Sequence, residues 1–158
     1  MCIRDSEAPG QVDAAGSVDL AGRLEYDEVA TVDRASDAMV VPSTFPEAFG
    51  MVAAEAAATG ALPVCAAHSG LAEVAGALGE ALPGDLGELT SFELGPGAVA
   101  GIADRLNRWL ALPLPEREAA EAALVGTVRA RWSWEGVAEG VVAAAGGDLA
   151  ALAPVPEG

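Results

Sequence analysis

The sequence predicts an α/β fold: a parallel sheet flanked by helices, followed by a helical C-terminal third. Short, continuous apolar runs alternate with segments of helical spacing, which is typical of strand–helix units joined by right-handed crossovers. The chain has 158 residues, which is about one domain at roughly 150 residues per domain. Its hydrophobic content of 52% is sufficient for a buried core and argues against a disordered chain.

The first part of the expected domain places two strands around one helix. Residues 18–24 predict a short strand that ends near Gly22, and residues 27–35 predict a short helix. The apolar run at 38–41, stopped by Pro42, is typical of a strand buried on both faces.

The middle of the chain repeats this alternation. A loop over 43–50 leads into a helix over 51–59, which is rich in alanine and is closed by Gly60 as its C-terminal cap. Residues 62–67 predict the next strand, and residues 71–78 predict a further short helix.

The last third is expected to be helical. A loop over 83–96, with room for one short strand, precedes a helix over 99–110 whose apolar residues recur at helical spacing. A second helix over 115–131 has proline in its first turn, where the missing N–H costs nothing. Ser133 is a good N-cap for a final helix over 134–145.

The expected domain boundaries follow from composition. Residues 1–17 are predicted to be a non-native or loop stretch, because Met1–Ser6 resembles translated sequencing-adapter read-through and polar residues follow it. Residues 18–146 form the predicted domain, and residues 147–158, rich in Pro and Ala, form a frayed tail. Because so little precedes the first expected strand, we expect the chain to be truncated at its N-terminus.

Charge and residue counts exclude several classes of function. The 24 acidic and 8 basic residues give a net charge of -16, which disfavours nucleic-acid and anionic-membrane partners. Two cysteines and a single histidine, His68, provide neither a metal-binding set nor a disulfide framework, so no metal is expected. No run approaches the roughly 18–20 apolar residues of a membrane span, and no leader peptide is recognisable, so we expect a cytoplasmic protein.

One loop and the helix after it hold the chemistry of the candidate site. Ligands bind outside the carboxyl ends of parallel strands, and Gly50 stands where the second strand hands over to its helix. The first helical N–H groups lack intrahelical partners and attract anions such as a diphosphate. Glu47 and Glu55, as carboxylates, can accept hydrogen bonds from sugar or ribose hydroxyls. Glutamates near a helix start also complement the helix dipole, so spacing alone leaves a purely stabilising role open.

The same segment resembles the donor-site signature of the family 4 glycosyltransferases, which are retaining enzymes of the GT-B fold. The resemblance is strong from about Val18 to Val74 and weaker up to Trp134. The motifs that carry it, in chain order, are Gly22-Arg23-Leu24, Ala35-Ser36-Asp37, Pro42-Ser43, Pro46-Glu47-Ala48-Phe49-Gly50, Glu55-Ala56, Gly60, Pro63-Val64, Ser69-Gly70-Leu71-Ala72-Glu73-Val74 and Arg131-Trp132-Ser133-Trp134.

The resemblance implies a Rossmann-like, nucleotide-sugar-binding domain, the C-terminal half of a hexosyltransferase. It implies that Glu47 holds donor-sugar hydroxyls at the reacting centre and that Glu55 binds the ribose. The remaining donor contacts that it implies are Phe49, Gly50, Met51 and Val52, through backbone N–H groups, and Arg23 and Leu24, beside the base. No cofactor is expected beyond the donor substrate, and no metal in the chemical step.

Three departures from the family pattern affect these expectations. The phosphate-binding Arg/Lys pair of the family lies upstream of the matched segment, and Arg4 is not a candidate because it belongs to Met1–Ser6. The N-terminal acceptor-binding domain is missing, so we expect this chain alone to be catalytically inactive. The usual Gly-Gly of the third loop is Ser69-Gly70 here, with His68 before it, and we expect that histidine to be uninvolved.

Other conspicuous residues are expected to be structural. Cys65 lies in an apolar run and should be an inert buried thiol, and Trp109, Trp132 and Trp134 should pack between helices. Glu73 is expected to be solvated or structural. Two alternatives remain: an epimerase or phosphorylase of GT-B architecture, and a non-catalytic folded fragment or interaction module.

Overall fold

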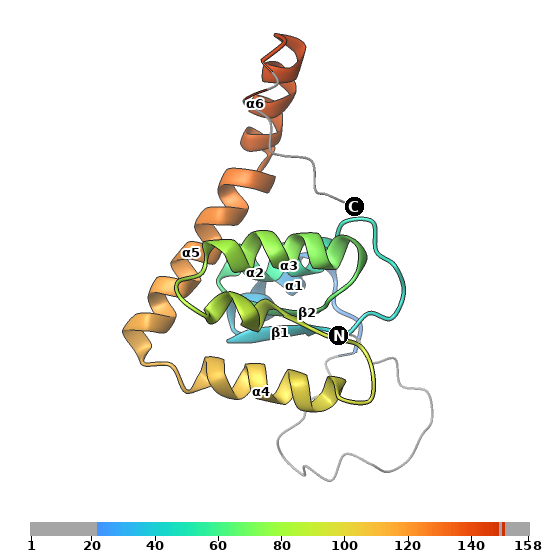
Figure 1. Cartoon of the computed structure of the whole chain (residues 1–158). Helices are drawn as coiled ribbons and strands as arrows, with labels where there is room; N and C mark the ends of the chain where they lie inside the picture. The colour runs from blue at the N-terminus through green and yellow to red at the C-terminus, as the bar shows by residue number, and fades with distance from the viewer. Residues whose placement is uncertain (1–21, 149, 151–158) are drawn as a thin grey trace.

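A computed structural model describes residues 22–148 and residue 150 of the chain. It is an α/β fold with a three-stranded parallel sheet in the order β1-β2-β3 and helices on both sides of it (Figure 1). The elements in chain order are α1 (Tyr26–Arg34), β1 (Ala38–Val41), α2 (Met51–Thr59), β2 (Leu62–Ala66), α3 (Ser69–Ala81), the 3-10 helix η1 (Leu86–Thr90), β3 (Ser91–Phe92), α4 (Ala98–Leu110), α5 (Leu114–Trp132) and α6 (Trp134–Ala145).

The helices form layers around the sheet. Helices α2 and α3 lie on one side of the strands and α4 lies on the other, while α5 crosses α2 and α3 and α6 extends away from the body (Figure 1). Trp109 of α4 is fully buried, and its indole N–H donates a hydrogen bond to the backbone carbonyl of Asp37, just before β1 (2.9 Å). A buried tryptophan with its polar group satisfied therefore attaches α4 to the start of the sheet.

The central strand explains an unusual proline. Every residue of β2 is buried, as expected for the middle of a parallel sheet. The Leu62 N–H donates to Asp37 O on the β1 side (3.1 Å). Because successive backbone nitrogens of a strand point to opposite sides, the nitrogen of Pro63 faces β3. Strand β3 begins only level with Cys65, so the missing N–H of the proline removes no ladder bond.

Most predicted elements are confirmed within a few residues. The helix over 51–59 ends as predicted at Gly60, whose φ of +97° suits glycine, and the bonds from Gly60 N–H to Ala57 O and from Ala61 N–H to Ala56 O form a Schellman cap. The helix expected over 71–78 is longer, because it begins at Ser69 and ends at Ala81.

Only the end of the first predicted strand lies within the described residues. Residues 18–21 lie outside the described residues, and residues 22–24 are not part of a strand. Gly22 adopts φ +68°, a left-handed conformation that favours glycine, and the Arg23 side chain is exposed. The stretch 1–17 and the tail from residue 151 also lie outside the described residues.

The C-terminal helices give one confirmation and one correction. Ser133 caps α6 as predicted, because its Oγ accepts the Gly136 N–H at 3.1 Å. Trp132 packs against the edge of the core, but Trp134 is 87% exposed, so the expectation that Trp134 packs between helices is wrong. In the described part of the chain, no helix combines the length and apolar character needed to cross a bilayer.

Candidate functional site

The start of α2 has the backbone geometry that the sequence predicts. Gly50 is the N-cap residue and is buried, with φ +89°, a conformation that favours glycine. A Cβ at this position would lie 2.8 Å from Leu71 Cδ2, so α3 leaves no room for a side chain. The N–H groups of Met51 and Val52, in the first turn, have no carbonyl before them in the helix to bond. This edge therefore offers backbone donors and the positive end of a helix dipole.

Glu47 lies on the loop between β1 and α2, and its backbone is bonded on both sides. Its N–H donates to Ser69 Oγ at 3.0 Å, and its carbonyl accepts the Gly70 N–H at 2.9 Å. Its carboxylate makes no hydrogen bond or ion pair with residues 22–148 and is not among their buried unpaired groups. The loop thus fixes the main chain of Glu47 and leaves its carboxylate open to a ligand.

Cys65 lies near this loop and is inert, as predicted. The thiol is fully buried in β2. Burial, and secondarily the negative charge of Glu47, raises the pKa of Cys65 to about 12. Because a thiol reacts as its thiolate, this cysteine is not a nucleophile near neutral pH.

His68 and Ser69 connect the loop to α3, which the sequence reasoning did not anticipate. His68 Nε2 lies 2.7 Å from the carbonyl oxygen of Ser43, and His68 Nδ1 lies 3.0 Å from Ser69 Oγ. These contacts give His68 a structural role that the sequence did not predict, and the expectation that His68 touches no ligand stays a prediction. The available signal was the position of His68, directly after a buried strand at the same edge of the sheet as Glu47.

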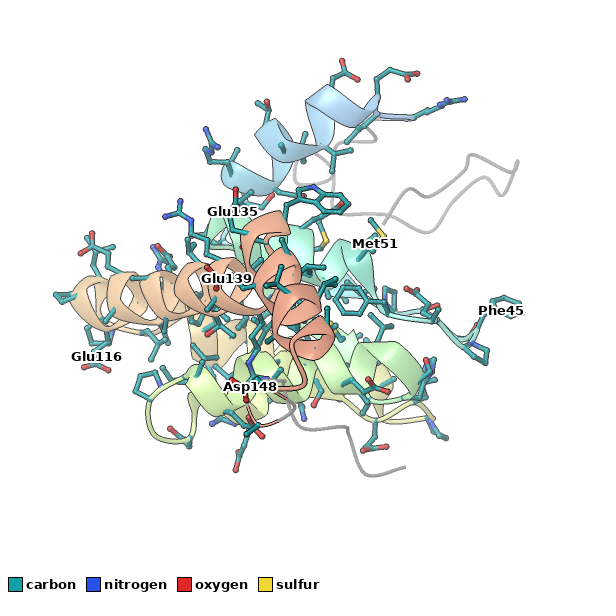
Figure 2. The ribbon with its side chains drawn as sticks, turned by 90° about the horizontal axis from the view of Figure 1, so that it is seen from above. Phe45, Met51, Glu116, Glu135, Glu139 and Asp148 are labelled. Atoms are coloured by element: carbon teal, nitrogen blue, oxygen red, sulfur yellow. The ribbon has the colours of Figure 1, made fainter. Side chains whose placement is uncertain are left out.

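The rim of the site is apolar and open. Phe45 and Met51 are exposed at 78% and 63%, and both lie on the side of the molecule opposite Glu116 (Figure 2). The Phe49 ring meets the edge of Trp132, at the end of α5, with ring centroids 5.5 Å apart. The sequence did not predict this contact between Trp132 and the loop.

The remaining predicted residues lie in two places. Glu55 is half-buried in the second turn of α2, and Val52 is exposed in the first. Arg23 and Leu24 lie in the irregular lead into α1, because the strand expected to present them is absent there, and Arg23 forms an exposed ion pair with Glu25. No described contact brings either residue to the loop at Glu47.

The ion pairs of the described arginines lie away from this edge. Arg117 pairs with Asp37 before β1, Arg108 pairs with carboxylates around η1, and Arg131 pairs with Glu80. Arg105 donates to the Ser91 and Gly101 carbonyls. Within residues 22–148, therefore, no arginine contact supplies positive charge at the start of α2.

Two surface grooves lie elsewhere on the molecule. One of about 510 Å³ lies between α3 and α5, and one of about 410 Å³ lies between α3 and the η1 segment. Neither of these two grooves is lined by Glu47, Gly50 or Glu55. Among the described residues, no cluster of three or more His, Cys, Asp or Glu side chains could hold a metal ion.

Comparison with known proteins gives one match. Residues 10–124 match the model of the family described as glycosyl transferases group 1. This range runs from before α1 into α5 and contains the whole β1–α2 loop and the start of α3. No curated protein and no solved structure matches the chain.

Proposed function

Because the chain belongs to the group 1 glycosyltransferases, we propose that the edge formed by the β1–α2 loop and the start of α2 binds a nucleotide-diphosphate sugar donor. More finely, we propose a retaining family 4 enzyme of the GT-B fold, of which this chain is the donor-binding half. The observation that carries the proposal is Gly50, three residues after Glu47, whose position as the left-handed N-cap leaves the Met51 and Val52 N–H groups without intrahelical partners.

Each part of the donor has a chemically suited partner at this edge. The diphosphate lies over the first turn of α2, where unpaired N–H groups and the helix dipole favour anions. Glu55 accepts hydrogen bonds from the vicinal ribose hydroxyls, and Glu47 accepts them from the sugar. Transfer breaks the bond from the anomeric carbon to the β-phosphate oxygen and forms one to the acceptor oxygen with the same configuration. The acceptor hydroxyl gives its proton to the β-phosphate oxygen of the departing nucleoside diphosphate.

Charge balance makes a second contributor necessary. A diphosphate carries at least two negative charges, whereas a helix N-terminus supplies roughly half a positive charge. Arg108, Arg117 and Arg131 form their ion pairs elsewhere, and Glu47 adds a negative charge to the loop. We therefore propose that an acceptor-binding domain supplies the missing cations, and that this chain alone is a weak nucleotide binder without transfer activity.

A thermal-shift series with UDP, GDP, ADP and TDP tests the proposal. A ligand that binds only the folded state stabilises it by about 2.7 kcal/mol at a hundredfold excess over Kd. We expect one nucleotide to raise the melting temperature, Glu55→Gln to abolish the shift, and Glu116→Gln to retain it. Glu116 is the matched control, because Glu116→Gln removes the same charge on the side of the molecule opposite Phe45 and Met51 (Figure 2).

Two outcomes would contradict this function. Cooperative melting without any nucleotide shift, together with self-association in sedimentation, would indicate an interaction module. A shift that Glu116→Gln reduces as much as Glu55→Gln would indicate a general charge effect and not a site at α2.

A further inference from the structure

Three consecutive residues at the start of α3 bond the β1–α2 loop at two places, Ser43 and Glu47. His68 contacts the Ser43 carbonyl, Ser69 accepts the Glu47 N–H, and Gly70 donates to the Glu47 carbonyl. A Cβ on Gly70 would lie 2.6 Å from the backbone of Phe49, so the two segments are in direct main-chain contact. The backbone that bears Glu47 is thus held from outside its own loop.

The hydrogen bonds define a single direction for each proton. A backbone carbonyl only accepts, so His68 Nε2 carries the hydrogen that goes to Ser43 O. In the neutral ring Nδ1 is then an acceptor, and the Ser69 hydroxyl donates to it. The Ser69 oxygen in turn accepts the Glu47 N–H. Each donor and each acceptor in this series makes one hydrogen bond, and consecutive hydrogen bonds of this kind strengthen one another.

Ser69 occupies a conformation that a serine adopts at a cost. Its φ is +50°, and it is the one non-glycine residue with positive φ among the described residues. Strained residues of this kind persist where their surroundings fix them. Glycine would relieve the strain here but would remove both hydrogen bonds of the hydroxyl. The serine therefore keeps the two hydrogen bonds that fix the loop, at the cost of a strained backbone at residue 69.

We propose that His68 and Ser69 are positioning residues that hold Glu47 in place for the donor sugar. This inference rests on the proposed function, because it requires that Glu47 binds the donor sugar. Neither side chain needs to touch the donor. Both act through the main chain of Glu47, whose carboxylate is bonded to none of the described residues.

Binding of a nucleotide sugar, compared with binding of its free nucleotide, tests the proposal on the full chain. The probes are UDP-glucose against UDP and GDP-mannose against GDP, measured by calorimetry for wild type, Ser69→Gly, Glu47→Gln and the double variant. We expect Ser69→Gly to lower the affinity gained from the sugar five- to tenfold and to change nucleotide affinity less than twofold. Because Ser69 acts through Glu47, the double variant should bind no more weakly than Glu47→Gln alone.

Stability separates positioning from a merely structural role. Ser69→Gly removes the backbone strain, so its melting temperature should be unchanged or raised while sugar recognition falls. A parallel loss of stability and of both affinities would overturn the proposal, as would an unchanged sugar contribution in Ser69→Gly. Absence of nucleotide binding by the wild type would instead overturn the proposed function and, with it, this inference.

A second measurement needs no ligand. His68 is the only histidine, so the imidazole nitrogen signals in a two-bond ¹H–¹⁵N spectrum belong to it alone. We expect the Nε2–H tautomer in the wild type, and at least tenfold faster hydrogen exchange of the Glu47 amide in Ser69→Gly. A neutral ring protonated on Nδ1, or an unchanged exchange rate at Glu47, would overturn the proposed arrangement.

Discussion

The two ends of the sheet's strands use their polar groups differently. At the amino end, Asp37 accepts the Trp109 and Leu62 N–H groups at its carbonyl and pairs with Arg117 through its carboxylate. At the carboxyl end, only the main-chain N–H and carbonyl of Glu47 form hydrogen bonds with the rest of the described fold. The difference teaches that the Asp37 side chain contributes to the stability of the fold, whereas the Glu47 carboxylate is bonded to none of the described residues and is free to bind a ligand. Four substitutions test this contrast.

The largest expected effect is at the amino end. Trp109→Ala should lower the free energy of unfolding by about 3–5 kcal/mol, because it removes a fully buried side chain and its hydrogen bond. The matched control is Trp134→Ala, which removes an exposed indole and should stay within about 0.5 kcal/mol of wild type. Urea denaturation measures both. Equal losses of unfolding free energy in the two variants would contradict the prediction that the buried Trp109 stabilises the fold and the exposed Trp134 does not.

At the carboxyl end, Gly70→Ala should cost about 1–3 kcal/mol, because a Cβ would meet the Phe49 backbone at 2.6 Å. It should also displace the loop and weaken nucleotide binding. Gly76→Ala is the control on the same helix: its Cβ meets nothing within 4 Å, and a helical glycine replaced by alanine gains about 0.5–1 kcal/mol. Denaturation of both variants should show opposite signs, and a stabilised Gly70→Ala would contradict the close approach.

Asp33, in α1 beside the amino end, should give a smaller and pH-dependent effect. It is buried, one carboxylate oxygen lacks a partner, and burial raises its pKa above the ordinary 3.8. The folded state then binds the proton more tightly, so this group lowers stability as pH rises from 3.8 through the raised value. Asp33→Asn should stabilise by about 1 kcal/mol at neutral pH, the scale for a buried unpaired group.

That gain should vanish below the ordinary carboxyl pKa, where both states of the wild type are protonated. Melting temperatures of wild type and Asp33→Asn between pH 3 and pH 8 measure it. Glu118→Gln, which changes an exposed carboxylate on α5, should show no such crossover. A constant difference between Asp33→Asn and wild type across this range would contradict the assignment of the effect to burial of a charge.

The smallest effect concerns the ion pair at the amino end. Arg117 Nη1 lies 3.2 Å from Asp37 Oδ1, but the aspartate is 57% exposed. Arg117→Met, which keeps the apolar stem, should cost about 0.5 kcal/mol, as exposed ion pairs do, and the cost should shrink in 1 M NaCl. If Arg117→Met lowered the free energy of unfolding more than Gly70→Ala, or by an amount that salt did not change, the main stabilising contact of Asp37 would be this ion pair and not its bond from Trp109.

The sequence was sufficient for local features and insufficient for those that depend on distant contacts. Gly60 and Ser133 were predictable as caps because a cap depends on a few neighbouring residues. Strands β1 and β2 were predictable because they are short apolar runs next to Pro or Gly, but only β2 is fully buried, whereas most of β1 is half-buried. The strand expected at 18–24 was not found at residues 22–24, because apolar character alone does not reveal the left-handed turn at Gly22.

In the site, the start of α2 was predictable and the contacts that hold Glu47 were not. The glycine at residue 50 and the flanking glutamates are close in sequence, and the family pattern marks them. The bond from Glu47 to Ser69 spans 22 residues, and that from His68 to Ser43 spans 25. Those contacts depend on the adjacency of two parallel strands, which the pattern implies, and on the positive φ of a serine, which it does not.

The three tryptophans occupy three distinct environments, and this gives the molecule its own optical readout. Trp134 is exposed to solvent, Trp109 is shielded in the core, and Trp132 meets the Phe49 ring just ahead of α2. Acrylamide should therefore quench the emission of Trp134 first and leave that of Trp109. In a Trp134→Phe background, a change in emission on adding a nucleotide would report on Trp132, one aromatic contact away from the helix start.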